Sequence, residues 1–289
     1  MKHYVEYLSV RAAARVVKPF SMARVRAWGA ALGRLAYRVD KRHRRVALEN
    51  LAAAFPGRTA AEREAIARGV YEHFGGVILE LLKVATMRPD ELLALCETEG
   101  DEHCWRALEP GKGVLCFTGH FGYWEVQAIA SAAKFTPFSV LARPLDNPHL
   151  HTMLERIRTM TGNQVIYRQG AIRRILRELA MNRGVAMLID QHLQRDAIMV
   201  DFFNRPAATT SALAVLALRT GAAVLPVFAL PLPGGRYRLI YERPVPPPRE
   251  DSPDAVREFT QRCTDVLEMY VRRHPELWLW LHRRWRNHE

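Results

Sequence analysis

From residue 110 onward the sequence alternates short apolar runs with stretches of helical periodicity, and no other feature restricts the fold as strongly. The apolar runs that follow Pro110-Gly111 are rich in Val, Ile, Leu and Phe. Such runs, separated by helical stretches, are typical of a mainly parallel sheet with crossover helices. The sequence therefore predicts an α/β fold in which helices flank a central sheet of about seven strands.

The predicted elements divide the chain into two parts. We expect an α/β domain over residues 46–289 and, before it, a helical extension over residues 1–45. The expected strands are residues 113–118, 138–142, 164–167, 185–190, 197–203, 223–230 and 237–242. The expected helices of the sheet region are residues 123–133, 148–161, 171–182, 210–219 and 253–273. Upstream, Thr59 and Glu62 have the spacing of a capping box that begins a long helix.

The positive charge of the chain is concentrated at its N-terminus. The whole chain carries a net charge of +12, and residues 1–45 hold twelve Lys or Arg side chains against two carboxylates. A local cationic surface of this kind favours a polyanionic partner. The three candidate classes are nucleic acid, anionic lipid and an acidic protein.

A basic amphipathic helix is predicted over residues 25–39. Its arginines occupy other faces than its apolar residues, which recur every three or four positions: Val25, Trp28, Leu32, Leu35 and Val39. Such a helix can lie in a headgroup layer, with its apolar stripe in the acyl boundary and its arginines on phosphates. The alternative is a helix that packs this stripe on its own domain and leaves a basic face in solvent.

Three absent patterns predict the compartment. The sequence has no run of 18 uncharged apolar residues, and its N-terminus lacks the regions of a signal peptide. The four cysteines form no C-x-x-C pair, which is compatible with a reducing compartment. We therefore expect the chain to stay in the cytoplasm, where attachment to an anionic membrane surface through the basic helix would be monotopic or peripheral.

One histidine lies where a catalytic base is expected. The segment Gly113 to Glu125 runs from a buried strand through a glycine-flanked turn into a helix. It places His120 at the carboxyl end of a strand, where open α/β sheets keep their sites. Glu125 lies five positions further on, in the first turn of the helix, and we expect it to accept a hydrogen bond from the imidazole. A histidine held in this way is a general base with a fixed tautomer.

The spacing alone is weak evidence, because about one accidental H-x4-[DE] pattern is expected among this many histidines and acids. The alternative is a loop histidine with a helix-capping glutamate. No G-x-S-x-G nucleophile motif is present, so a base here favours direct transfer to an acceptor hydroxyl. The N–H groups of Phe121, Gly122 and Tyr123 are expected to be free for a developing oxyanion.

Several further blocks of sequence accompany this motif in a fixed order. They are Asn50-Leu51, Phe55-Pro56, Gly119 to Glu125, Ala142 to Pro148, Gly162, Asp190-Gln191, Phe202 to Ala207, Thr209, Arg219 to Pro226, and Pro275 to Trp285. Together they resemble the bacterial lipid A late acyltransferases, lauroyl and myristoyl transferases that share the H-x4-D/E motif with the glycerolipid acyltransferases. The resemblance covers roughly Val39 to the C-terminus.

The resemblance implies a glycerolipid acyltransferase-like fold and an O-acyltransferase activity. The donor would be an acyl thioester of acyl carrier protein or coenzyme A, used as a co-substrate, with no bound cofactor and no metal. The acceptor would be a membrane glycolipid, a lipid A precursor first and a phosphatidylinositol mannoside as the alternative, at the cytoplasmic face of the inner membrane. His120 would be the base and Glu125 its orienting partner.

The resemblance also implies substrate-binding residues near this pair. Arg143 and Asn147 would form a second site element, in which the guanidinium holds a phosphate or the thioester oxygen. The alternative for Arg143 is a salt bridge at a strand end. Asp190 and Gln191 would bind the head group or cap the next loop. Gly122 and Tyr123 in the turn would contact substrate, and Tyr123 replaces an Asn that is common in the family.

Two open questions concern other classes of function. A nucleic-acid-binding protein would account for the +12 charge, but it predicts stacking aromatics among the basic residues or a helix-turn-helix, and neither is found. We therefore expect no nucleic-acid partner.

The C-terminal tryptophans leave two placements open. Either they form a second interfacial patch or they are part of the core: Trp278, Trp280 and Trp285. Chain length, carrier, exact acceptor and oligomeric state are not encoded in these motifs.

Overall fold

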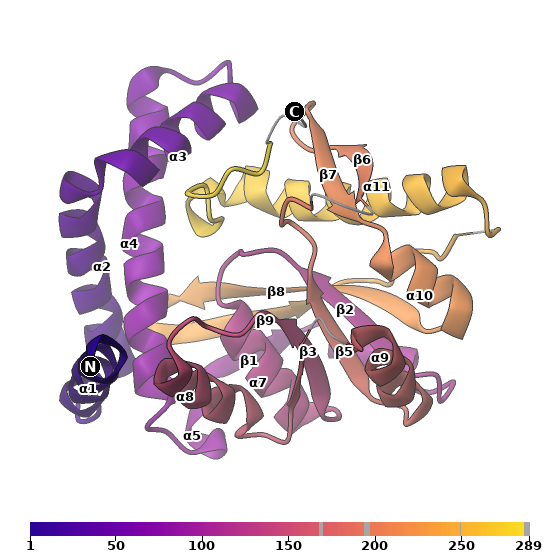
Figure 1. Ribbon diagram of the computed structural model, residues 1–289, viewed down its shortest axis with the longest axis horizontal. Coiled ribbons are helices and arrows are strands. Elements are labelled where there is room, and N and C mark those ends of the chain that lie inside the picture. The colour runs from indigo at the N-terminus through magenta and orange to yellow at the C-terminus, as the bar shows by residue number, and fades with distance from the viewer. Residues whose placement is uncertain (168–169, 194–196, 249, 286–289) are drawn as a thin grey trace.

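The computed structural model describes residues 1–167, 170–193, 197–248 and 250–285. Its centre is a seven-stranded sheet in the order β1-β9-β8-β2-β5-β3-β4, in which only the β8–β9 pair is antiparallel (Figure 1). The strands are β1 (Cys96–Glu99), β2 (Val114–Thr118), β3 (Phe138–Ala142), β4 (Gln164–Tyr167), β5 (Gly184–Leu188), β8 (Ala223–Leu232) and β9 (Arg236–Tyr241). The predicted α/β class with a mainly parallel sheet is confirmed.

One predicted strand lies outside this sheet, and one strand of the sheet was not predicted. The predicted strand 197–203 forms β6 (Ala197–Asp201), which pairs with β7 (Pro206–Thr210) in a separate antiparallel ribbon. The seventh strand of the sheet is instead β1, an edge strand that pairs with β9. The β1 sequence, Cys-Glu-Thr-Glu, has no apolar run because an edge strand is only half covered.

Two hydrophobic cores cover the two faces of the sheet. Alternate residues of β2 enter them: Leu115 and Phe117 lie in one core, Val114 and Cys116 in the other. The first core includes side chains of α9 (Ala171–Ala180), α10 (Ala212–Thr220) and α11 (Pro253–Arg273). The second includes side chains of α6 (Asp101–Leu108), α7 (Trp124–Lys134) and α8 (Pro148–Thr159). Figure 1 shows α11 above the sheet and α7 below it.

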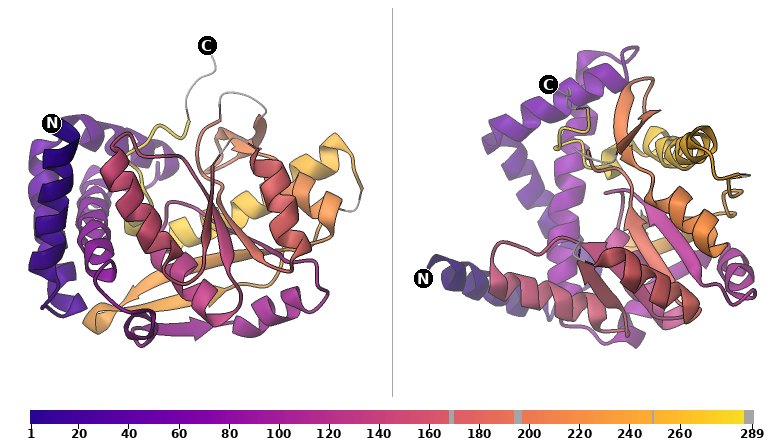
Figure 2. Two further views of the ribbon diagram at one scale, coloured as in Figure 1. Left: turned by 60° about the horizontal axis from the view of Figure 1, so that its bottom comes forward. Right: turned by 45° about the vertical axis from the view of Figure 1, so that its right-hand side comes forward.

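The N-terminal region is helical, as predicted. It consists of α1 (Lys2–Val17), α2 (Met22–Val39), α3 (Lys41–Ala54), α4 (Ala60–Val84) and the short α5 (Pro89–Leu93). The predicted capping box begins α4, with Thr59 Oγ1 accepting from the Glu62 N–H and Glu62 accepting from the Thr59 N–H. Figure 2 shows α1 and α2 stacked beside α4 at one side of the sheet. The expected boundary at residues 45–46 falls inside α3.

Helix α2 approaches α4 closely at two glycines, and the Tyr37 ring of α2 also contacts the Tyr71 ring of α4. A Cβ atom at Gly33 would lie 2.0 Å from the Tyr71 carbonyl oxygen, and one at Gly29 would lie 2.4 Å from that of Gly75. Of the predicted apolar stripe, only Val25 is buried, whereas the rest is 37–70% exposed: Trp28, Leu32, Leu35 and Val39. The stripe therefore does not pack on its own domain. No helix in the described part of the chain is long and apolar enough to cross a bilayer.

Candidate active site

The strand register brings His120 and Asp190 together. Strands β2 and β5 are parallel neighbours in which Thr118 pairs with Leu188, so the residues two positions beyond each strand meet at the same sheet edge. His120 Nδ1 lies 2.9 Å from Asp190 Oδ1, and the His120 backbone N–H donates to Asp190 Oδ2 at 2.7 Å. Asp190 therefore fixes both the backbone and the ring of the histidine.

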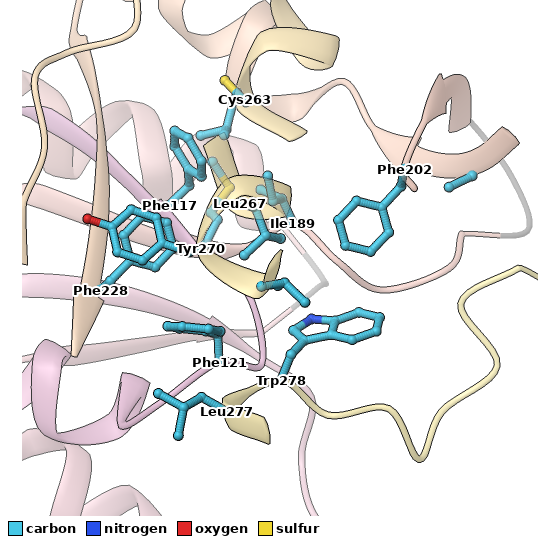
Figure 3. Close-up of a cluster of buried hydrophobic side chains, with 14 of the residues drawn as sticks. Phe117, Phe121, Ile189, Phe202, Phe228, Cys263, Leu267, Tyr270, Leu277 and Trp278 are labelled. Carbon is cyan, nitrogen blue, oxygen red and sulfur yellow. The ribbon is translucent and has the colours of Figure 1, made fainter. Parts of the chain in front are cut away.

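Asp190 is enclosed by the C-terminal strap, which we define as residues 275–285. The residue is 1% exposed, and the Trp278 indole N–H donates to Asp190 Oδ2 at 2.8 Å. The strap is bonded to the turn that carries His120, because the Leu279 N–H donates to the His120 carbonyl oxygen at 3.0 Å. Figure 3 shows Trp278 among buried side chains, with Phe202 above it and Phe121 to its left, and the Phe202 ring contacts the indole.

The ion pair sets the protonation of both partners. Burial alone would lower the pKa of His120, but the Asp190 carboxylate and its hydrogen bond, with a smaller contribution from Glu125, raise it above the ordinary 6.5. Burial alone would raise the pKa of Asp190, but His120 holds the pKa of that carboxyl well below its usual range. With Nδ1 assigned as the donor to a carboxylate, the lone pair of His120 is on Nε2. The Gln191 amide nitrogen lies 3.4 Å from this Nε2, at the exposed side of the ring.

The expected hydrogen bond between Glu125 and His120 is corrected by the structure. Glu125 lies in the first turn of α7 and is paired with Arg158 of α8, whose Nε lies 2.9 Å from Glu125 Oε2. The carboxylate that contacts the imidazole is that of Asp190 instead. Five residues of separation across a strand-to-helix turn therefore did not bring the two side chains into hydrogen-bond contact. Glu125 acts on the histidine through its charge.

The expected free amides of the turn are also corrected. The Phe121 N–H donates to the Gly119 carbonyl oxygen, and the Gly122 N–H donates to that of Leu277. The Tyr123 N–H donates to the Ala229 carbonyl oxygen. All three donors are used to hold the turn, so they are not available for an oxyanion.

Gly122 and Tyr123 have structural roles instead of the expected substrate contacts. Gly122 has a φ of +57°, and a Cβ there would lie 2.0 Å from the Ala229 carbonyl oxygen. Tyr123 is buried, and its hydroxyl donates to Glu80 at 2.8 Å. Glu80 is itself buried and is held by Arg26 of α2 with Nε–Oε1 at 2.8 Å. The side chain that replaces the common Asn therefore belongs to a buried polar network that connects α2 and α4 to the turn after β2.

Arg143 and Asn147 are bonded to groups other than the imidazole. Arg143 is exposed, and its guanidinium lies 3.3 Å from Asp146, which is the salt-bridge alternative. Asn147 is the N-cap of α8, and its amide nitrogen donates to the His3 carbonyl oxygen at 2.8 Å and to Glu6. It therefore connects α1 to α8.

The structure gives Asp190 a different role from the two that were considered, binding a head group or capping a loop. Its carboxylate is bonded to His120.

Two contributors to the site were not predicted from the sequence. Trp278 is fully buried against Asp190, and Trp280 is also fully buried, so these two residues belong to the core and not to an interfacial patch. Arg158 neutralises Glu125 beside the histidine. The block Pro275 to Trp285 stood out in the sequence, but nothing in its local pattern indicates which side chain it contacts 88 residues upstream.

A narrow cavity adjoins the site. It lies between α7 and strands β2, β3 and β5, has a volume of about 60 Å³, and is lined at one end by Glu125, Arg158 and Trp124. The Trp124 ring also contacts the His120 ring, with centroids 5.4 Å apart. The walls are mainly apolar. A base with an unprotonated Nε2 beside an apolar cavity defines an α/β enzyme that can activate a hydroxyl next to an apolar substrate.

Comparison with known proteins identifies the class. The sequence profile of the family described as bacterial lipid A biosynthesis acyltransferase matches residues 2–287. The chain therefore belongs to this family.

Relatives have been named in two glycolipid pathways. Phosphatidylinositol mannoside acyltransferase of Mycolicibacterium smegmatis is 27% identical over 188 residues, which is 64% of this chain and 60% of the mycobacterial protein, less than two thirds of its length. The lipid A biosynthesis myristoyltransferase of Escherichia coli is 26% identical over 87% of this chain and 78% of its own. The corresponding lauroyltransferase is 28% identical, over 89% and 84%.

Among solved structures, the 1-acyl-sn-glycerophosphate acyltransferase PlsC from Thermotoga maritima is similar to this chain. The match covers 85% of this chain and 98% of that one, with 12% identity and a TM-score of 0.39.

Proposed function

We propose that this protein is an O-acyltransferase that moves a fatty acyl group from a thioester of acyl carrier protein or coenzyme A to a hydroxyl of a membrane glycolipid. A lipid A precursor is the proposed acceptor. The observation that carries the proposal is the pairing of His120 Nδ1 with the buried Asp190, because it leaves Nε2 basic at the sheet edge. The named lipid A acyltransferases among the relatives support the choice of acceptor.

The proposed acyl transfer includes two proton transfers, one to His120 and one from it. His120 Nε2 takes the proton of the acceptor hydroxyl, and the alkoxide oxygen attacks the carbonyl carbon of the thioester. The tetrahedral intermediate collapses with cleavage of the C–S bond, the ester forms, and the imidazolium returns its proton to the thiolate. Asp190 stabilises the imidazolium between these steps. The first-turn N–H groups of α7, which have no intrahelical acceptor, are the proposed partners of the oxyanion.

The exposed apolar stripe supports attachment to a membrane surface, and the surface that we propose is the cytoplasmic face of the inner membrane. On α2 the stripe is formed by Trp28, Leu32, Leu35 and Val39, and α1 adds exposed Tyr4, Val5, Leu8 and Val16. The segment that carries the stripe is also cationic, because most of the net charge lies within residues 1–45. Apolar side chains at the acyl boundary with cations on lipid phosphates are the arrangement of an interfacial helix. This attachment would bring the site to a glycolipid acceptor.

Replacing Leu32 and Leu35 together with serine is expected to weaken binding to anionic vesicles by at least about tenfold. Both side chains are more than half exposed, so their burial in lipid rather than in the protein supplies the lost free energy. Vesicle co-sedimentation measures the partition. Ile172→Ser on α9, a similarly exposed apolar residue on another helix, is the control and should bind normally. Equal binding by the double variant would contradict the membrane role of the stripe.

The proposed function is tested by supplying both substrates to the purified protein. Lipid A precursor and a phosphatidylinositol mannoside are offered separately, each with an acyl thioester on acyl carrier protein and on coenzyme A. Mass spectrometry should find one added acyl chain, ester-linked, on the lipid A precursor. Acylation of the mannoside alone would transfer the proposal to the second acceptor, for which the mycobacterial relative is named. Acylation of neither would reject it.

A further inference from the structure

The cavity beside the histidine is lined by two side chains that each carry an oxygen without a hydrogen-bond partner among the described residues, although the Gln127 amide nitrogen donates to Ser131 Oγ at 3.5 Å. Its apolar walls include Phe138, Val140 and Met187. Thr118 and Gln127 also line it and are 7% and 3% exposed. Within the described residues, Thr118 Oγ1 and Gln127 Oε1 are buried and have no hydrogen-bond partner.

Folding alone does not account for this pair. A buried polar atom without a partner loses its hydrogen bonds to water and gains none in return, so it destabilises the folded chain. Valine at 118 and leucine at 127 would fill similar volumes without this cost. By contrast, Ser131, which lies deeper in the same cavity, is paired with the Tyr241 hydroxyl at 2.8 Å. The unpartnered atoms therefore point to a ligand that supplies a hydrogen-bonding group.

The two polar side chains lie close to the reacting end of the cavity. Thr118 is the last residue of β2, two positions before His120. Gln127 is in the first turns of α7, two positions after Glu125, which lines the same cavity. Phe138 begins β3 and marks the end of the cavity farthest from the catalytic edge, since β3 and β5 are parallel. A group bonded to Thr118 and Gln127 would therefore lie only a few atoms from a thioester carbonyl at His120.

We propose that this cavity binds the first carbons of an acyl chain that carries a hydroxyl near its thioester, as in a 2-hydroxyacyl or 3-hydroxyacyl donor. The proposal rests on the acyltransferase function proposed above. The chain hydroxyl donates its proton to Gln127 Oε1 and accepts a hydrogen bond from Thr118 Oγ1. The apolar walls contact the neighbouring methylenes. At about 60 Å³ the cavity holds a few water-sized groups, which matches the start of a chain rather than its whole length.

The test compares donors of one chain length on one carrier. Purified protein is given the plain, 2-hydroxyacyl and 3-hydroxyacyl thioesters, and kcat/KM is measured for each. One of the hydroxylated donors is expected to be preferred over the plain donor by at least about tenfold, because only its hydroxyl pairs with the buried polar atoms. Gln127→Leu is expected to reduce this ratio to about one or below, and Thr118→Val to reduce it as well.

The matched control is Met187→Leu, a substitution of similar volume in an apolar wall of the same cavity, which should keep the preference. Thermal unfolding of each variant shows whether it is folded. Thermal stabilisation by free hydroxylated and plain fatty acids gives a second comparison, which needs no turnover and should show the same preference in the unsubstituted protein.

The outcomes separate the two proposals. Transfer from all donors with a ratio near one overturns this inference alone and means that only water pairs with the two atoms. A preference that survives in Gln127→Leu also overturns it. Transfer from no donor, with no stabilisation by any fatty acid, overturns the acyltransferase proposal and this inference with it.

Discussion

Replacing His120 with alanine is expected to lower kcat for acyl transfer by about 10²-fold to 10⁴-fold, the usual contribution of a general base. The reason is that the variant has no group at the sheet edge to take the hydroxyl proton. Steady-state transfer of a radiolabelled acyl group measures the loss. The fold should survive, because Asp190 keeps the backbone N–H of residue 120 and the Trp278 indole as donors.

Thermal unfolding provides the control for this variant. His120→Ala should unfold cooperatively but at a lower temperature than the unsubstituted protein, since the buried Asp190 loses its ionic partner and keeps only the backbone N–H of residue 120 and the Trp278 indole as donors. His274→Ala, at the end of α11, should be active. Near-normal kcat in a folded His120→Ala protein would contradict the assignment of the base.

Asp190→Asn is expected to have the second large effect, a loss of about 10²-fold to 10⁴-fold in kcat/KM. The amide has the size of the carboxylate but carries no charge to stabilise the imidazolium, and it can hold the ring in the wrong tautomer. Glu125→Gln should cost about tenfold or less, because Glu125 is bonded to Arg158 and acts on His120 only through its charge. Steady-state kinetics of the two variants measure the difference.

Which of the two variants, Asp190→Asn or Glu125→Gln, loses more activity shows which carboxylate orients the histidine. The motif alone assigns the orienting role to Glu125, whereas the structure assigns it to Asp190. Trp278→Phe gives an intermediate case, since it removes one donor to Asp190 and keeps an aromatic ring in the core. A greater loss in Glu125→Gln than in Asp190→Asn would favour the motif.

The parts of the fold that depend on local pattern were predictable from the sequence. Strand β2 and the turn after it place His120 at a sheet edge, because a buried run, glycines and a helix start are all visible within thirteen residues. The partner of His120 was not predictable in this way. Asp190 is 70 residues away in sequence, and it meets the histidine only because β2 and β5 are neighbours in register. Periodicity predicts strands but does not predict their order.

The buried face of α2 shows a second limit of pattern analysis. The periodicity of large apolar residues predicted a stripe through Trp28 and Leu35. Close packing of two helices selects small ones, and α2 meets α4 at Gly29 and Gly33. The position of the stripe along the helix was predicted, but the exposure of Trp28 and Leu35 depends on which face α4 covers.

The pH dependence of kcat/KM tests most directly whether Asp190 governs the base. In the unsubstituted protein the acidic limb should report a histidine pKa above 6.5, with activity lost as the imidazole becomes protonated. Asp190→Asn removes the carboxylate that raises the pKa of His120 against the effect of burial, so the acidic limb should move to lower pH. In Glu125→Gln the limb should move less. A limb that stays in place in Asp190→Asn, or that shifts mainly in Glu125→Gln, would contradict the account.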